Sequence, residues 1–188
     1  MKTTLKHIAE IQTGLFAKTV SNGDIVSLQA RHFDEYGQLI AELHPDLKAD
    51  KIAERHLLKH GDVLFAAKGN KNFAAYYESK NLPAVASTSF FVIRMKEEYH
   101  NLILPGFLVW FINNPETQKF LKDNAIGSSI ASISKAVLEE LEISIPDLQK
   151  QKTILKIIQL RNAEKKIIQQ IQILKEKQIQ QKIINALK

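Results

Sequence analysis

Residues 148–187 of this sequence read LQKQKTILKIIQLRNAEKKIIQQIQILKEKQIQQKIINAL. The stretch contains neither Gly nor Pro and is dense in Ile, Gln and Lys, which is typical of one uninterrupted helix. At a rise of 1.5 Å per residue, such a helix is about 60 Å long, roughly twice the width of a small domain. The rest of the chain is too short to bury it, so the helix needs a packing partner from elsewhere.

Apolar side chains in this stretch recur every eleven residues. The recurring positions are Ile157 with Ile168 and Ile179, Leu160 with Ile171, and Ala163 with Leu174. Eleven residues over three turns give about 3.67 residues per turn, close to an unstrained helix, so the pattern favours a nearly straight pairing with a second helix. A helix lying back on its own domain is the alternative. The expected pairing surface consists of Ile157, Leu160, Ile168, Ile171, Leu174 and Ile179.

The sequence of residues 1–147 predicts a mixed α/β domain, and a chain of this length can bury a sizeable core. Alternating or apolar runs predict strands at residues 25–30, 39–43, 63–67, 74–77, 84–94 and 141–145. Helical spacing predicts short helices at residues 5–14, 105–112 and 115–122 and a helical turn within 51–58, and Ser134 fits the N-cap of a further helix. The run at 84–94 is the longest strand signal, so we expect it at the centre of a sheet.

The net charge of +6 is unevenly distributed along the chain. Residues 148–188 carry ten Lys and Arg against Glu164 and Glu176, a balance of +8, whereas residues 1–147 carry sixteen basic and eighteen acidic side chains, a balance of −2. Basic proteins often bind nucleic acid, but a solvated helix face explains the same excess. The charge alone therefore does not assign DNA binding to the domain.

The composition also bounds the class of protein. The chain contains no Cys, which excludes a disulfide framework and a thiolate metal site. Its first residues are polar rather than an apolar signal core, and no run of eighteen apolar residues occurs. We therefore expect a soluble, cytoplasmic protein without a membrane span.

Arrangements that carry catalysis are hard to find in this sequence. His56 and His60 are spaced like two metal ligands on one face of a helix, but no third ligand follows at a suitable distance. Pro146-Asp147 and the later Glu164-Lys165-Lys166 resemble the carboxylates and lysine of metal-dependent nucleases, yet about 25 Å of helical rise separates them, so they cannot converge on one ion. No phosphate-binding loop and no nucleophile elbow occurs. We expect no metal, no cofactor and no catalytic residues.

Two polar loops remain as candidates for binding, at residues 68–72 and 127–129. Lys and Arg can position a protein on phosphates, while Asn, Gln and Ser can read the edges of bases. A plain solvated loop is the alternative for each of these residues. The loops indicate binding more than catalysis.

Residues 127–154 read GSSIASISKAVLEELEISIPDLQKQKTI. They contain a Gly, an Ile-Ser pair and a Leu-x-x-Leu-x-Ile-x-Ile-Pro segment, followed by Leu-x-x-Gln-x-x-Ile at the start of the long helix. Weaker matches are Ile8-Ala9-Glu10-Ile11 with Gly14, and Gly61-Asp62-Val63-Leu64-Phe65-Ala66 with Gly69. In this order the chain resembles, over nearly its whole length, the DNA-specificity subunit of type I restriction-modification systems.

The resemblance implies an α/β target-recognition domain at residues 1–147 and a spacer helix at 148–188, with no catalysis of its own. The usual subunit of that family alternates two such domains with two antiparallel helices, which act as a ruler between two half-sites. This chain holds one domain and one helix, so it is either a half-subunit that dimerises through its helix, a fragment or an idle remnant. Asp147 and Gln149 depart from the family, which often has a second Pro and an acidic residue there.

We therefore predict a non-catalytic, sequence-specific DNA-binding subunit of a type I restriction-modification complex. Its expected partners are double-stranded DNA, a methyltransferase subunit, through it a restriction subunit, and a second copy of the chain. The alternative is a helical scaffold or oligomerisation protein without DNA recognition. The side chains expected to contact DNA are Lys68, Asn70, Lys71, Asn72, Ser128 and Ser129.

Overall fold

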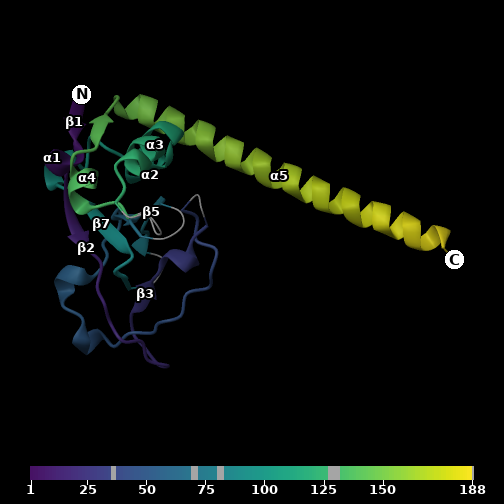
Figure 1. Cartoon of the computed structure of the whole chain (residues 1–188), viewed down its shortest axis with the longest axis horizontal. Helices are drawn as coiled ribbons and strands as arrows, with labels where there is room; N and C mark the ends of the chain where they lie inside the picture. The colour runs from purple at the N-terminus through teal and green to yellow at the C-terminus, as the bar shows by residue number, and fades with distance from the viewer. Residues whose placement is uncertain (35–36, 69–71, 80–82, 127–131, 188) are drawn as a thin grey trace. The chain divides into compact units, whose positions relative to one another are not determined.

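The structure is a computed structural model that describes residues 1–34, 37–68, 72–79, 83–126 and 132–187 (Figure 1). The chain divides into two compact units, Met1–Leu148 and Gln149–Lys188. The first unit mixes strands and helices, and the second belongs to one long helix, α5 (Leu148–Ala186). The predicted fold class, a mixed α/β domain followed by a long helix, is confirmed.

A four-stranded antiparallel sheet forms the centre of the first unit. Its order is β2 (Ala9–Thr13), β7 (Phe90–Met95), β4 (Val63–Ala66) and β5 (Ala74–Tyr76). In the register, Ile93 of β7 lies between Ile11 of β2 and Val63 of β4. Both Ile93 and Val63 are fully buried, so the core lies against the middle of this sheet.

The sequence prediction for residues 84–94 is half right. The central strand is indeed there, as β7, but residues 84–86 form a separate strand, β6 (Ala84–Ala86). β6 pairs in parallel with β3 (Val26–Leu28) in a second, two-stranded sheet, and a turn over Ser87–Ser89 separates it from β7. The Ser87 and Ser89 hydroxyls lie 2.8 Å apart in a hydrogen bond, which helps to fix this turn.

The predicted helix at residues 5–14 is wrong over most of its length. Only α1 (Leu5–Ile8) is helical, and it connects β1 (Lys2–Thr4) to β2. Residues 9–13 pair instead with residues 91–95 of the central strand, from Ala9 opposite Met95 to Thr13 opposite Phe91. Because the segment 8–11 carries apolar residues at both spacings, this pairing decides between helix and strand.

Two further predictions need correction. Residues 39–43 form no strand; Leu39 makes only an isolated bridge to Phe33. The region around 51–58 contains two short 3-10 turns, Ala49–Lys51 and Glu54–His56, rather than an α-helical turn. These turns alternate with extended residues that bridge to other segments, such as Leu57 to Val85.

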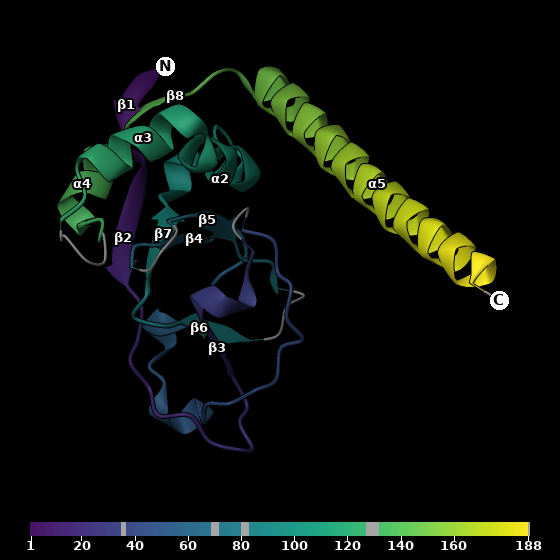
Figure 2. The same ribbon diagram turned by 45° about the vertical axis from the view of Figure 1, so that its right-hand side comes forward.

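Three short helices and a last strand complete the first unit. They are α2 (Pro105–Asn113), α3 (Pro115–Asp123), α4 (Lys135–Glu139) and β8 (Glu142–Ser144), which pairs with β1. As predicted, Ser134 caps α4, since its Oγ accepts a hydrogen bond from the Val137 amide at 3.2 Å. Figures 1 and 2 show α2 to α4 near β5 and β7, while β3 and β6 lie away from the helices.

The backbone of the edge strand β5 is closed off by a side chain of α2. Asn113 donates from Nδ2 to the Ala74 carbonyl at 2.7 Å and accepts at Oδ1 from the Ala74 amide at 2.7 Å. One amide group thus satisfies both polar groups that Ala74 leaves open at the edge of the sheet. The contact also holds α2 on β5.

The second unit presents its apolar side chains to solvent. Apart from the half-buried Ile158, the large apolar residues from Ile157 to Leu187 are exposed to between 45% and 83%. Among the described residues, no helix is both long and apolar enough to cross a membrane. The helix α5 therefore carries exposed apolar side chains along most of its length.

Candidate nucleic-acid interface

Four chain segments meet at one end of the four-stranded sheet. Because neighbouring strands are antiparallel, β2 and β4 both finish at this end, whereas β7 and β5 both begin there. The register places Thr13 opposite Phe91 and Ala66 opposite Phe90. We call this region the loop end of the sheet; it comprises residues 14–16, 67–68, 72–73 and 87–89.

Backbone hydrogen bonds hold these segments together. The Gly14 amide donates to the Phe90 carbonyl at 3.0 Å, and the Leu15 amide donates to the Ala86 carbonyl at 2.7 Å. On the other side, the Ala67 amide donates to the Ser89 carbonyl at 3.0 Å. The segments that follow β2 and β4 are therefore both fixed to the turn before β7.

Lys68, the first residue of one predicted binding loop, lies at this end and pairs with a segment that follows the other predicted loop in the sequence. Lys68 forms an antiparallel bridge with Ser132, and Ser132 forms another with Ile126. The Ile133 amide also donates to the Ala67 carbonyl at 3.0 Å. Lys68 is exposed, so its ammonium group is available to a partner. The predicted residues Asn70, Lys71, Ser128 and Ser129 lie outside the described residues.

Asn72 contributes to the shape of its own loop. Its Nδ2 donates to the Ala66 carbonyl at 2.8 Å, so the side chain closes the loop back onto the end of β4. Beneath it, the rings of Phe33, Phe73 and Phe90 lie with their centroids 5.9–6.1 Å apart. Phe73 and Phe90 are buried, so a cluster of packed aromatic rings supports the loop end.

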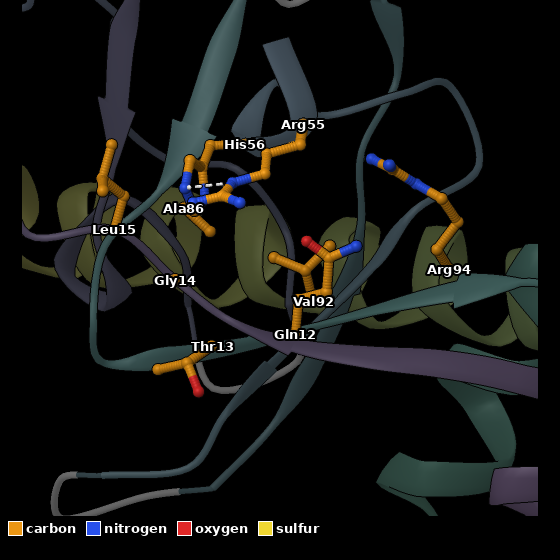
Figure 3. A pocket seen from close by; sticks show the side chains of 9 residues that line it. All are labelled: Gln12, Thr13, Gly14, Leu15, Arg55, His56, Ala86, Val92 and Arg94. Atoms are coloured by element: carbon orange, nitrogen blue, oxygen red, sulfur yellow. Dashed lines mark hydrogen bonds between the residues drawn. The ribbon is translucent and has the colours of Figure 1, made fainter. Parts of the chain in front are cut away.

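A small polar hollow, about 10 Å³ in volume, lies beside the loop end (Figure 3). It combines the end of β2 with the 3-10 turn at Glu54–His56 and with β7. Three nitrogen-rich side chains line it. The lining residues are Gln12, Thr13, Gly14, Leu15, Arg55, His56, Ala86, Val92 and Arg94.

The guanidinium group of Arg94 forms an ion pair within the protein. Its Nε and Nη2 donate to the two carboxylate oxygens of Asp62 at 2.8 and 2.6 Å, and Nη2 also donates to the Leu57 carbonyl at 3.0 Å. The hydrogen bonds that Arg94 donates to Asp62 raise the pKa of Arg94, although burial acts in the opposite direction. Asp62 also accepts from the Lys59 amide at 2.8 Å. The pair thus ties the segment 57–62 to the central strand.

Arg55 is different, because no ion pair joins it to a carboxylate of the described residues. Its Nε donates to His56 Nε2 at 3.3 Å, which Figure 3 shows as a dashed line. Arg55 is exposed and His56 is half-buried. This leaves the remaining donors of the Arg55 guanidinium free to meet an anion at the rim of the hollow.

Sequence reasoning missed two features of this region. Arg55 is 35 residues or more from the strands β2 and β7 in the sequence, and nothing in its local pattern signals that they meet. Phe16 is 84% exposed, next to a strand end that the sequence analysis treats as a helix end. An aromatic residue between Gly14 and Lys18 was the available signal.

His56 and His60 gather no third ligand, and no group of three His, Asp or Glu suited to a metal occurs within the described ranges.

Comparison with known proteins gives one family match. The family model described as type I restriction modification DNA specificity domain matches residues 49–176. The match includes the segment after β3, the strands β4 to β8 and the first part of α5. No curated protein sequence matches the chain.

Three solved structures share the fold. One comes from a study of complex assembly and conformational transition in the type I R-M system, with a TM-score of 0.63 and 14% identity over 87% of this chain. The HsdS subunit from Thermoanaerobacter tengcongensis has a TM-score of 0.59 and 14% identity, and the type I restriction-modification S subunit from M. genitalium has 0.59 and 13%, each over 87% of this chain. The chain covers only 38%, 37% and 39% of these three structures, respectively.

Proposed function

The chain belongs to the type I restriction modification DNA specificity domain family, and on that premise we propose that it is the sequence-specific DNA-binding subunit of a type I restriction-modification complex. In this proposal the subunit performs no chemistry. Residues 1–147 read one half-site on the DNA, and residues 148–188 form a spacer and pairing helix. Methylation and cleavage belong to separate chains that the subunit recruits.

The observation that supports the proposal is the bridge between Lys68, an exposed residue of one predicted loop, and Ser132, which follows the other predicted loop in the sequence. This bridge joins residues that are more than sixty positions apart, while the bridge from Ser132 to Ile126 joins two residues of the same region. Loops that a packed scaffold holds side by side are a common arrangement for recognition. Exposed cationic groups at the same end, Lys68 and Arg55, suit a phosphate backbone.

We assign the DNA contacts to this end. Lys68 and Lys71 contact phosphates, while amide and hydroxyl groups of the two loops contact base edges. The Asn72 amide closes its loop with one N–H and keeps its Oδ1 for a base or a water molecule. The full set of proposed contacts is Lys68, Asn70, Lys71, Asn72, Ser128 and Ser129.

The long helix is assigned to pairing with a second copy of the chain. Burial of its exposed apolar side chains provides the driving force. Two paired chains present two identical domains, so the DNA site is symmetric and interrupted. The proposed contacts are Ile157, Leu160, Ile168, Ile171, Leu174 and Ile179, which are all exposed in the single chain.

We also assign to the helix the recruitment of a methyltransferase chain and, through that chain, of a restriction chain. Its exposed apolar residues surround the helix rather than follow one stripe; Ile171 and Ile173, for example, point about 160° apart at 100° per residue. One partner helix therefore leaves apolar surface uncovered. A further protein chain fits that surface.

The test begins with selection of binding sites from randomised duplexes, using the full chain with and without the co-expressed methyltransferase chain. We expect a two-part symmetric site. On that site, Lys68→Ala should lower the affinity about threefold to tenfold and reduce the slope of log affinity against log salt by about one, because one phosphate contact is lost.

The control variant is Lys6→Ala. Lys6 lies in α1, before the opposite end of β2, and its ammonium group forms an exposed ion pair with Glu140 at 2.6 Å. It removes the same charge from the same unit, so an equal loss of affinity in both variants would mean that only net charge matters. If neither the chain alone nor the complex selects any site, the protein is not a DNA-binding subunit.

A further inference from the structure

Phe16 is an unusual feature of the loop end. Its side chain is 84% exposed, more than any other large apolar side chain that the structure describes in the first unit. Isolated exposed apolar residues are common on proteins, but a phenyl ring is large and is usually well buried. Its position three residues after the end of β2 places it at the same end of the sheet as the end of β4, which Lys68 follows.

The backbone that carries Phe16 is held firmly. Gly14 and Leu15 donate to Phe90 and Ala86, and Leu15 forms a parallel bridge with Ser87. The chain runs so close to this turn that a Cβ added at Gly14 would lie 2.0 Å from the Ser87 carbonyl oxygen. The ring is therefore presented from a fixed segment, which lowers the entropic cost of using it in binding.

The surroundings of Phe16 are polar and cationic. The hollow beside it is lined by Gly14 and Leu15 on one side and by Arg55 and His56 on the other (Figure 3). Lys18 follows two residues later and is exposed. Neither Lys18 nor Arg55 forms an ion pair with a carboxylate among the residues that the structure describes.

From this combination we propose that Phe16 inserts between two adjacent base pairs of the bound duplex, while Arg55 and Lys18 hold the flanking phosphates. The proposal rests on the DNA-binding function above and adds a mechanism of sequence preference to it. An apolar wedge between base pairs unstacks one step and kinks the duplex. Pyrimidine–purine steps unstack most easily, so the wedge selects sequence without hydrogen bonds to bases.

A protein partner fits this surface less well. Energetically important residues of protein interfaces are surrounded by other contacts that exclude water, and large exposed patches mark such sites. Phe16 instead stands in the sequence between exposed Thr13 and exposed Lys18, its apolar neighbour Leu15 is half-buried, and Leu15 lines the same hollow as the exposed Arg55. A single exposed ring in a segment with cations nearby suits a base stack between phosphates.

The first measurement uses the duplex selected by the full-length wild-type chain, with 2-aminopurine placed at each position in turn. Insertion of Phe16 predicts a rise in fluorescence at one step when the wild-type chain binds, because that base loses its stacking neighbour. Phe16→Ala should abolish the rise and lower the affinity about tenfold, the effect expected of one lost aromatic stacking contact. Phe16→Trp should retain the rise in fluorescence and the affinity of the wild-type chain.

The second measurement tests insertion at the same base-pair step by changing the DNA instead of the protein. A mismatch at the responsive step removes most of the cost of unstacking before the protein arrives. Wild type should then bind the mismatched duplex more tightly than the intact one, whereas Phe16→Ala, which does not unstack the step, should bind both duplexes with the same affinity. The loss caused by the substitution should therefore exceed about tenfold on the mismatched duplex. An equal loss on both duplexes would overturn the wedge.

The control is Leu102→Ala, which removes an apolar side chain that is 49% exposed after the opposite end of β7. It should change neither affinity nor fluorescence. If wild type selects a site but Phe16→Ala binds it equally well, the proposed function stands and the wedge fails, whether or not the variant loses a protein partner. If wild type selects no site, both fail.

Discussion

Asp62 is the residue on which the geometry of the polar hollow depends. Its side chain is 2% exposed and accepts hydrogen bonds from Arg94 and from the Lys59 amide. Arg94 also donates to the Leu57 carbonyl, so one ion pair joins β7 to the segment that follows the Arg55–His56 turn. A buried charge is costly to leave unpaired, and here both partners are satisfied by several hydrogen bonds.

We predict that Asp62→Ala destabilises the domain by about 2 to 3 kcal/mol, somewhat less than the loss of a fully buried partner, because the Arg94 side chain keeps 21% of its surface exposed. Urea unfolding followed by Trp110, the only Trp of the chain, reports on this unit. Lys6→Ala, which breaks an exposed pair, should cost less than about 1 kcal/mol. Equal effects in the two variants would show that Asp62 has no special structural role.

At the residue scale, local composition pointed to Lys68, which begins a run of polar residues, and that signal needs no knowledge of the fold. Its role in DNA binding stays a prediction. Arg55 and Phe16 could not be found in this way, because their significance depends on which strands meet. The loop-closing hydrogen bond of Asn72 to Ala66 likewise depends on the path of the backbone.

At the element scale, the predictions succeeded for segments whose sequence indicates only one type of secondary structure. Pro105 and Pro115 open α2 and α3 as expected, and β4 and β5 occupy their predicted runs. The region 5–14 failed because its apolar residues fit two periods, and pairing of Ala9–Thr13 with β7 decided the outcome. The split of 84–94 followed from the Ser87–Ser89 turn, whose polar residues the sequence analysis included in the strand.

The helix α5 makes a separate prediction at this scale. Ile168→Glu places a charge within the proposed pairing surface, so the full chain should shift from a dimer to a monomer of 21.3 kDa in sedimentation experiments. Gln169→Glu adds the same charge at the adjacent exposed position and should remain dimeric. Both substitutions keep good helix formers in the chain.

The outcomes separate the possible modes of association. A dimer that survives Ile168→Glu would move the interface away from the proposed residues. A wild-type chain that stays monomeric at high concentration would exclude the homodimer, and pairing with the helix of another chain would then be tested by adding the methyltransferase chain. Loss of the dimer in both variants would show that a Glu at either position disrupts pairing, so the effect would not identify the proposed surface.

At the scale of the whole molecule, the family resemblance read from residues 127–154 is confirmed by the family match over residues 49–176. The structure adds that one domain and one helix make up the chain, and that the chain spans less than two fifths of the compared structures. The Asn113 contact closes the Ala74 backbone of β5 to further strands. Association through the exposed helix is therefore favoured over extension of the sheet at Ala74.

The length of α5 also has a consequence for rotational phase on the DNA. Duplicating one repeat, residues 157–167, lengthens the helix by about 16 Å, or about five base pairs, and keeps the same helix face. Five base pairs turn the duplex by about half a revolution, so the two domains of the proposed dimer would face opposite sides and binding should collapse at every spacer length near the original. A double duplication adds about ten base pairs and should restore binding to a site lengthened by that amount. Gel shifts on a series of spacer lengths would reveal this alternation, and a variant that kept the original spacer would show that the helix does not set the distance.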